Sequence, residues 1–203
     1  MGKRLIPLLI NEGCSVKALV RKGSESKVPN GCAFVIANPF EAETFTDTIP
    51  ENAVFIQLLG VPHPGPSKKE LFKTIDLASV KASANAALHA NASHFIYVSA
   101  AQTPTNIMKD FQQSRAEAES IIQSTGIPAT FIRPWYVIGP GHYWPLLLQP
   151  MFKILQWIPS TSEKAKALRL IYLSQMLKTL VSAVKKLPQN GMRIIKVDEM
   201  SRM

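Results

Sequence analysis

The sequence predicts an α/β fold in which helices cover both faces of a doubly wound parallel sheet. Short apolar runs rich in β-branched residues alternate with longer segments whose apolar positions have helical spacing. The runs are continuously apolar, which is typical of strands buried on both faces. With 203 residues, 46% of them hydrophobic, the chain can bury one sizeable core. We therefore expect one sheet that organises the whole chain.

The first part of the chain predicts three strands. Segment 3–11 is apolar at helical spacing, and Gly13 is a plausible end for this helix. Strands are expected over 15–21, 32–37 and 53–59, with a short helix over 40–48. Segment 61–67 holds three prolines and a glycine, so we expect a rigid loop there.

The second part continues the alternation. Helices are expected over 69–91, 107–124 and 173–186, and strands over 95–100, 129–133 and 192–197. Ligands of such sheets bind beyond the carboxyl ends of the strands. The residues at those ends are Arg21, Asn38, Leu59, Gly60, Ser99, Ala100, Pro134, Trp135 and Tyr136.

Three motifs in this order resemble a known family. Ser99 follows an aromatic-rich strand, Phe111-x-x-x-Arg115 lies on the next helix, and Arg133-Pro134 leads into Gly139-Pro140-Gly141. The chain resembles the extended and atypical short-chain dehydrogenase/reductases over nearly its whole length, and is most similar to the epimerase-like and NmrA-like kinds. The resemblance implies a Rossmann-like NAD(P)-binding part over 1–141. It also implies a small substrate or cap part over 142–203, packed on the same domain.

The front end of that family is absent from this chain. Such folds open with a strand and a Gly-x-x-Gly-x-x-Gly loop, whose N–H groups hold the pyrophosphate. Here Gly2 matches the last glycine. The missing strand is central in the order 3-2-1-4-5-6, so strands 15–21 and 53–59 should each lose a neighbour. Either the start is assigned too late or the gene is decayed, which the apolar face of 3–12 favours, or the remaining strands close up without cofactor.

The resemblance also suggests how a nucleotide is held. Arg21, with Lys22 beside it, ends its strand where an acid would bind a ribose hydroxyl; a guanidinium suits a 2′-phosphate, which favours NADP over NAD. An ordinary surface charge is the alternative. Asn38 stands near the expected adenine, where it either bonds the base or only starts the Asn38-Pro39 turn.

The catalytic residues of the family are only partly present. Catalytic relatives use a Tyr whose pKa a nearby Lys lowers, together with a Ser that bonds the reacting oxygen. Ser99 fits the Ser role, Phe111 occupies the Tyr position, and Arg115 takes the Lys place, where it could still bind the nicotinamide ribose. Phe111 has no ionisable proton. Tyr136 and His63 are candidate substitute acids.

Further side chains around these positions have expected roles. His142 and Tyr143 are two more candidate acids beside the glycine turn. Leu59, Gly60, Pro134 and Trp135 should line the cofactor site. Tyr97 alternates with Ser99 and should pack in the core.

Composition limits the remaining functions. Cys14 and Cys32 give no disulfide framework and no metal-ligand spacing, so we expect a cytoplasmic protein without a metal. The net charge is +9, concentrated after residue 161, but no motif points to nucleic acid. Segment 143–159 is apolar but too short to span a bilayer, so it forms either a cap over the substrate cleft or a weak membrane-surface contact.

The expected function is therefore an NAD(P)H-dependent oxidoreductase or epimerase-like protein with a degenerate catalytic motif. A non-catalytic NADPH-sensing or assembly protein is the alternative, and a peripheral membrane protein is a weaker one. The sequence indicates neither the small-molecule substrate nor the oligomeric state.

Overall fold

In the part of the chain that the structure describes, the strands are all parallel and form three sheets. The computed structural model describes residues 1–102, 108–140, 143, 169–188 and 191–203. One sheet pairs β1 (Lys17–Val20) with β2 (Ala33–Ile36), and a short pair joins β6 (Val137–Ile138) to β7 (Ile171–Tyr172). The largest sheet has the order β3-β4-β5-β8, and its strands are β3 (Val54–Gln57), β4 (His94–Val98), β5 (Ala129–Ile132) and β8 (Met192–Ile195). The predicted α/β class is confirmed.

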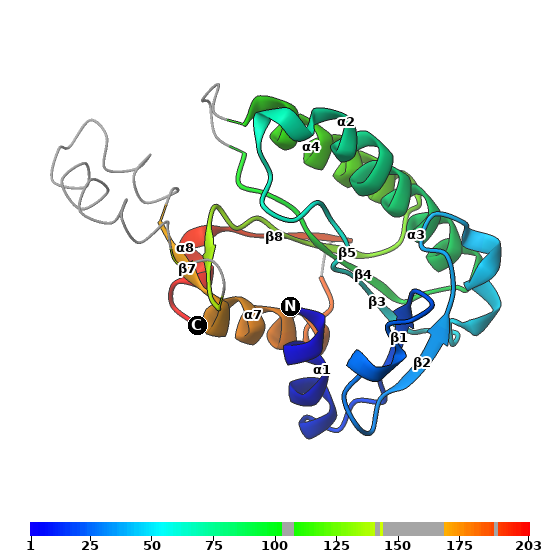
Figure 1. The fold of residues 1–203 in the computed structure, drawn as a ribbon. Helices are drawn as coiled ribbons and strands as arrows, with labels where there is room; N and C mark the ends of the chain where they lie inside the picture. Colours follow the sequence, from blue (N-terminus) through cyan, green and yellow to red (C-terminus); the bar gives the residue numbers. More distant parts are fainter. Residues whose placement is uncertain (103–107, 141–142, 144–168, 189–190) are drawn as a thin grey trace, which may run out of the picture.

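Helices cover both faces of the largest sheet (Figure 1). On one face lie α2 (Lys69–Leu71), the π-helical segment η5 (Phe72–Leu77), α3 (Ala78–His89) and α4 (Lys109–Ser124). On the other lie α1 (Gly2–Asn11) and α7 (Leu173–Lys185). The short α8 (Val197–Met200) follows β8, and 3-10 turns lie at Glu25–Lys27, Ala42–Thr44, Thr46–Thr48 and Pro66–Lys68.

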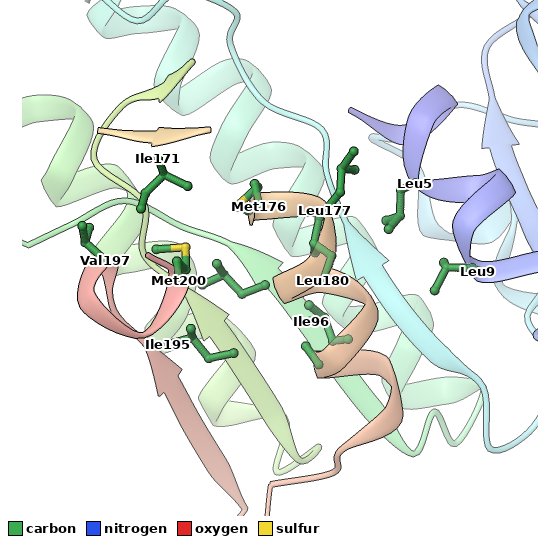
Figure 2. Packing of buried hydrophobic residues seen from close by; sticks show 12 residues of the cluster. Leu5, Leu9, Ile96, Ile171, Met176, Leu177, Leu180, Ile195, Val197 and Met200 are labelled. Carbon is green, nitrogen blue, oxygen red and sulfur yellow. The ribbon is translucent and has the colours of Figure 1, made fainter. Parts of the chain in front are cut away.

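Two hydrophobic clusters fill the space between these layers. Successive side chains of a strand point to opposite faces, so Phe95 and Tyr97 pack beneath α3 and α4, whereas Ile96 between them faces the other layer. Figure 2 shows the cluster that contains Ile96, in which Leu5 and Leu9 of α1 lie near α7. The prediction that Tyr97 packs in the core is confirmed, because its side chain is fully buried.

The sheet is interrupted where the sequence predicts a missing strand. Within the described residues, β1 pairs only with β2, and β3 pairs only with β4. Across the sheet the strands follow one another as β2, β1, the interruption, β3, β4, β5 and β8 (Figure 1). The interruption lies where the predicted order 3-2-1-4-5-6 has strand 1. Leu5 and Leu9 share a cluster with Val16, which precedes β1, and with Val54 of β3. Helix α1 therefore packs against both sides of the interruption.

Segment 40–48 is not the continuous helix that we predicted. It forms the two 3-10 turns Ala42–Thr44 and Thr46–Thr48. The hydroxyls of Thr44, Thr46 and Thr48 donate to the carbonyl oxygens of Glu41, Ala42 and Phe45. Such local bonds compete with the bonds of a regular helix.

The predicted helix 69–91 is confirmed in outline but contains the π-helical turn η5. Each of the six predicted strands ends one or two residues before its predicted limit, as β1 shows against 15–21, whereas β4 begins one residue earlier than predicted. No sequence pattern predicted the two-residue strands β6 and β7 or the short helix α8.

The end of the chain adds to the main layers. Strand β8 pairs with β5, and Met176 and Leu180 of α7 belong to the same cluster as Leu5. The predicted division at residue 141 stays a prediction, because 144–168 lies outside the described residues, as do Gly141 and His142. None of the helices in the described ranges has the length and apolar run needed to cross a bilayer.

Candidate functional site

The carboxyl ends of β4 and β5 remain joined beyond the strands themselves. Ser99, the residue after β4, donates its N–H to the Ile132 carbonyl at 2.8 Å, and Ala101 donates to the Pro134 carbonyl at 2.8 Å. Ser99 is 4% exposed, and its hydroxyl has no hydrogen-bond partner in the described part of the chain. A buried hydroxyl without a partner is unusual. This oxygen could accept or donate a bond to a ligand.

A buried ion pair lies beside this strand end. The Arg115 Nη2 of α4 is 3.1 Å from Oδ2 of Asp76, and the two side chains are 8% and 0% exposed. Arg115 Nη1 donates to the Tyr97 hydroxyl at 2.9 Å and to the Val98 carbonyl at 3.0 Å. Oδ1 of Asp76 accepts the N–H of Val61 at 2.7 Å. These contacts join η5, α4, β4 and the loop that follows β3.

Local packing brings the two charges together. Segment η5 widens the helix by one residue in the turn that carries Asp76, which is a common local arrangement at functional sites. Helix α4 packs on η5 through the Phe72 and Phe111 rings, whose centroids are 5.2 Å apart. Ser114 also donates to the Phe72 carbonyl at 3.2 Å. The Arg115 guanidinium lies 5.0 Å from the centre of the Phe111 ring.

Burial dominates the electrostatics of these groups. It raises the pKa of the Tyr97 phenol to about 12, although the Arg115 guanidinium acts in the opposite direction. Burial also raises the pKa of Asp76, against the pull of Arg115 and of the Val61 N–H. The pKa of Tyr136 is raised by burial as well, so its phenol keeps its proton at neutral pH. Tyr97 therefore serves as a neutral acceptor for Arg115.

Gly60 is the residue that leaves room for this arrangement. A Cβ atom at Gly60 would lie 2.4 Å from Arg115 Nη2 and 3.2 Å from Asp76 Oδ1. The first distance is shorter than carbon and nitrogen atoms tolerate without moving. Any side chain here would push the guanidinium away from its carboxylate.

The predicted residues on the nucleotide side are mostly at the surface. Arg21, Lys22 and His63 are exposed, and Leu59 is 39% exposed. Asn38 forms the turn that was one of its two predicted roles, since its Oδ1 accepts the Phe40 N–H at 3.1 Å.

Gly2 begins α1 beside the end of β3. Its added Cβ would be 3.7 Å from Leu58, which is an ordinary contact, so packing here does not require glycine.

Of the candidate residues Ser99, Arg115 and Tyr136, the structure brings the first two close together. Both lie at the end of β4, because Arg115 bonds the carbonyl of the residue before Ser99. Tyr136 follows β5, with its ring 5.4 Å from that of Trp135, which packs against the cluster under α7. Its approach to Ser99 stays a prediction, as does contact of Arg115 with a nucleotide ribose.

Asp76 is the site residue that sequence reasoning missed. It is the one carboxylate in the stretch Phe72–Leu88, whose other residues are mostly apolar or small. A single acid on the buried face of such a helix needs a partner, because an unpaired buried charge is very costly. That signal could have paired Asp76 with Arg115.

Replacing Tyr97 by Phe should destabilise the protein modestly. The guanidinium would lose a buried acceptor, at a cost of about 1–2 kcal/mol in the free energy of unfolding. Urea denaturation measures the change, and Tyr143→Phe, at a tyrosine that is 56% exposed, is the control. Equal midpoints for Tyr97→Phe and the unsubstituted protein would contradict the assigned bond.

Comparison with known proteins gives one family and one fold. Residues 1–139 match a family described as NAD(P)H-binding. No curated protein matches the sequence.

Solved structures with the same fold include WbmH of Bordetella bronchiseptica in complex with NAD+, which is 16% identical with a TM-score of 0.65. The match covers 92% of this chain and 69% of that one. UDP-glucuronic acid 4-epimerase of Bacillus cereus, in complex with NAD, is 13% identical with a TM-score of 0.67, over 96% of this chain and 73% of the epimerase. MoeE5 in complex with UDP-glucuronic acid and NAD is 12% identical with a TM-score of 0.67, over 97% and 72%.

Proposed function

Because the chain belongs to the NAD(P)H-binding family, we propose that it binds a nicotinamide dinucleotide across the carboxyl ends of its parallel strands. The observation that supports this most is the strand order: from β1 the chain continues outward to β2 on one side of the interruption, and from β3 outward to β4, β5 and β8 on the other side (Figure 1). Ligands of open α/β sheets bind at such a switch point. Helix α1 begins there, with Gly2 next to Leu58 at the end of β3, so its first N–H groups suit a pyrophosphate.

The proposed cofactor is NADP, placed with its adenosine part near β1 and β2. Arg21 and Lys22 are exposed directly after β1 and would bind a 2′-phosphate, while Asn38 and its turn lie at the end of β2. Leu59 and Gly60 would lie beneath the middle of the bound NADP. Its nicotinamide end would then lie by Ser99, Pro134, Trp135 and Tyr136.

The proposed chemistry is an oxidoreductase or epimerase-like reaction on a small molecule. Bound NADP(H) would supply or accept the hydride. The Ser99 hydroxyl fits the task of bonding the reacting oxygen, since it is buried at the strand end and has no hydrogen-bond partner among the described residues. Tyr136 would donate the proton as a neutral phenol, and His63 is the second candidate.

A non-catalytic NADPH-sensing role is the second candidate, and the packing around Phe111 favours it. The Phe111 ring contacts both the Phe72 ring and the Arg115 guanidinium, and it has no ionisable proton to donate. The Arg115 guanidinium is paired with Asp76, so it is already engaged in the protein interior. A membrane-surface contact through 143–159 and the cytoplasmic location stay predictions.

NADPH titration followed by nicotinamide fluorescence tests the proposal. We expect saturable binding, and Arg21→Gln should raise the Kd for NADPH about tenfold, the factor that 1.4 kcal/mol represents. The Kd for NADH should not change, because NADH lacks the 2′-phosphate.

Lys27→Gln, at another exposed cation, is the control for overall charge. Absence of saturable binding of either nucleotide would overturn the proposed function. An equal loss for NADPH and NADH in Arg21→Gln would overturn only the NADP preference. Turnover of carbonyl substrates with bound NADPH would separate the catalytic candidate from the sensing one.

A further inference from the structure

We propose that Asp76 and Arg115 are a positioning pair, which fixes the segment after β3 and thereby shapes the floor of the nucleotide site. This inference rests on the proposed function. It differs from the prediction that Arg115 contacts the nicotinamide ribose, because the pair acts here through backbone groups of Val61 and Val98. Asp76 and Arg115 would influence nucleotide affinity without touching the nucleotide.

The contacts of the pair reach two neighbouring strand ends. Asp76 accepts the Val61 N–H, three residues beyond the Leu58 that follows β3. Arg115 donates to the Val98 carbonyl, the last residue of β4, directly before Ser99. One ion pair of 3.1 Å therefore connects the loop after β3 to the end of β4.

Burial strengthens this ion pair and limits the movement of its side chains. Both side chains lie in the protein interior, where an ion pair is screened little by water or salt. The Arg115 guanidinium also passes within contact distance of Gly60, where even a methyl group would be too close. The backbone at Gly60 and the guanidinium thus have a fixed relation. A displaced guanidinium would release Val61 and change the course of the loop.

The position of the loop matters for the ligand. Leu59 and Gly60 precede Val61 and lie at the carboxyl end of β3, which is where the proposed nucleotide passes. Ser99 lies at the neighbouring end. An error of about 1 Å in such supporting groups can cost on the order of a hundredfold in function. The pair therefore keeps the carboxyl ends of β3 and β4 in the relative position that nucleotide binding requires.

Hydrogen exchange and nucleotide titration together test this proposal. The variants are Arg115→Met and Asp76→Asn, and the control is Asp110→Asn. Asp110 also pairs across the helices, with Lys69 at 3.0 Å, but both side chains are about half exposed. In both buried-pair variants we expect amide exchange over 58–62 to accelerate at least about tenfold and the Kd for NADPH to rise about tenfold. The control should change neither.

The outcomes separate the alternatives. Unchanged exchange over 58–62 in the folded variants overturns the proposal, whether or not the Kd rises; a raised Kd alone would mean that Arg115 contacts the nucleotide directly. Faster exchange with an unchanged Kd also overturns it, because the pair is then only structural. If the unsubstituted protein binds no NADPH, the proposed function fails, and the exchange experiment still decides whether the pair fixes the loop.

The conservative variant Arg115→Lys keeps the test possible if Arg115→Met does not fold. It keeps a cation for Asp76 but cannot also bond both Tyr97 and Val98 in the fork geometry of arginine. We expect exchange over 58–62 and the Kd for NADPH to lie between those of the unsubstituted protein and Asp76→Asn. Unchanged values for both Arg115→Lys and Asp76→Asn would overturn the proposal even if Arg115→Met does not fold.

Discussion

Gly60→Ala is expected to lower the free energy of unfolding by about 3–5 kcal/mol, the usual cost of leaving a buried charge without its partner. The new methyl carbon would lie 2.4 Å from Arg115 Nη2, so the guanidinium has to move. Asp76, which is fully buried, would then lose its counter-charge. Denaturation with urea measures the loss as a lower transition midpoint.

Two comparisons show whether the contact with Arg115 is the cause. Gly65→Ala is the control, since nothing lies within 4 Å of the added carbon. In an Arg115→Ala background, Gly60→Ala should cost less than about 1 kcal/mol, because the closest atom that the new carbon would meet has been removed and only the milder approach to Asp76 Oδ1, at 3.2 Å, remains. A cost that is equal in both backgrounds would show that the clash is not the reason.

The protein should lose stability as the pH falls below about 6.5, on account of His94. This ring is completely buried on β4, with Nε2 2.8 Å from the Thr130 hydroxyl and Nδ1 without a hydrogen-bond partner in the described part of the chain. Burial lowers the pKa of His94 to about 4. The unfolded chain therefore binds a proton at a higher pH than the folded protein does.

The direction and size of the effect follow from that difference. Stability from the neutral ring is complete above pH 6.5 and declines until about pH 4, by a total on the order of 3 kcal/mol. Urea denaturation at a series of pH values measures the slope. His94→Gln should flatten it, whereas His89→Gln, at an exposed histidine, should not. A slope that survives in His94→Gln would assign the acid sensitivity to other groups.

The arrangement of strands was largely predictable from sequence. The run from Phe95 to Val98 is apolar apart from the Tyr97 hydroxyl, and its alternation already placed Tyr97 in the core. The strand was predicted to reach residue 100, whereas β4 ends at Val98, directly before Ser99. The strand order that the resemblance implies predicted that β1 and β3 do not pair directly with each other, as is observed. These features depend on periodicity and order, which the sequence displays directly.

The contacts of the site were much less predictable. The position of Arg115 in the motif suggested a contact with the cofactor, whereas its guanidinium pairs with Asp76. Asp76 lies in a π-helical turn that no residue pattern predicts. The 3-10 turns near Thr44 depend on hydroxyl bonds that compete closely with a helix. Side-chain pairings of this kind are decided by tertiary packing and by small energy differences, which local sequence does not encode.

The interruption between β1 and β3 also makes unfolding of the protein less cooperative, because it separates two groups of strands. The β1–β2 ladder has four paired positions and, within the described ranges, no hydrogen-bonded pairing with the largest sheet. Phe34 and Ile36 of β2 are about half exposed. A ladder of this size adds little stability by itself. We expect this pair to open locally at a lower free energy than β4 and β5 do, so that a bound adenosine would slow its opening first.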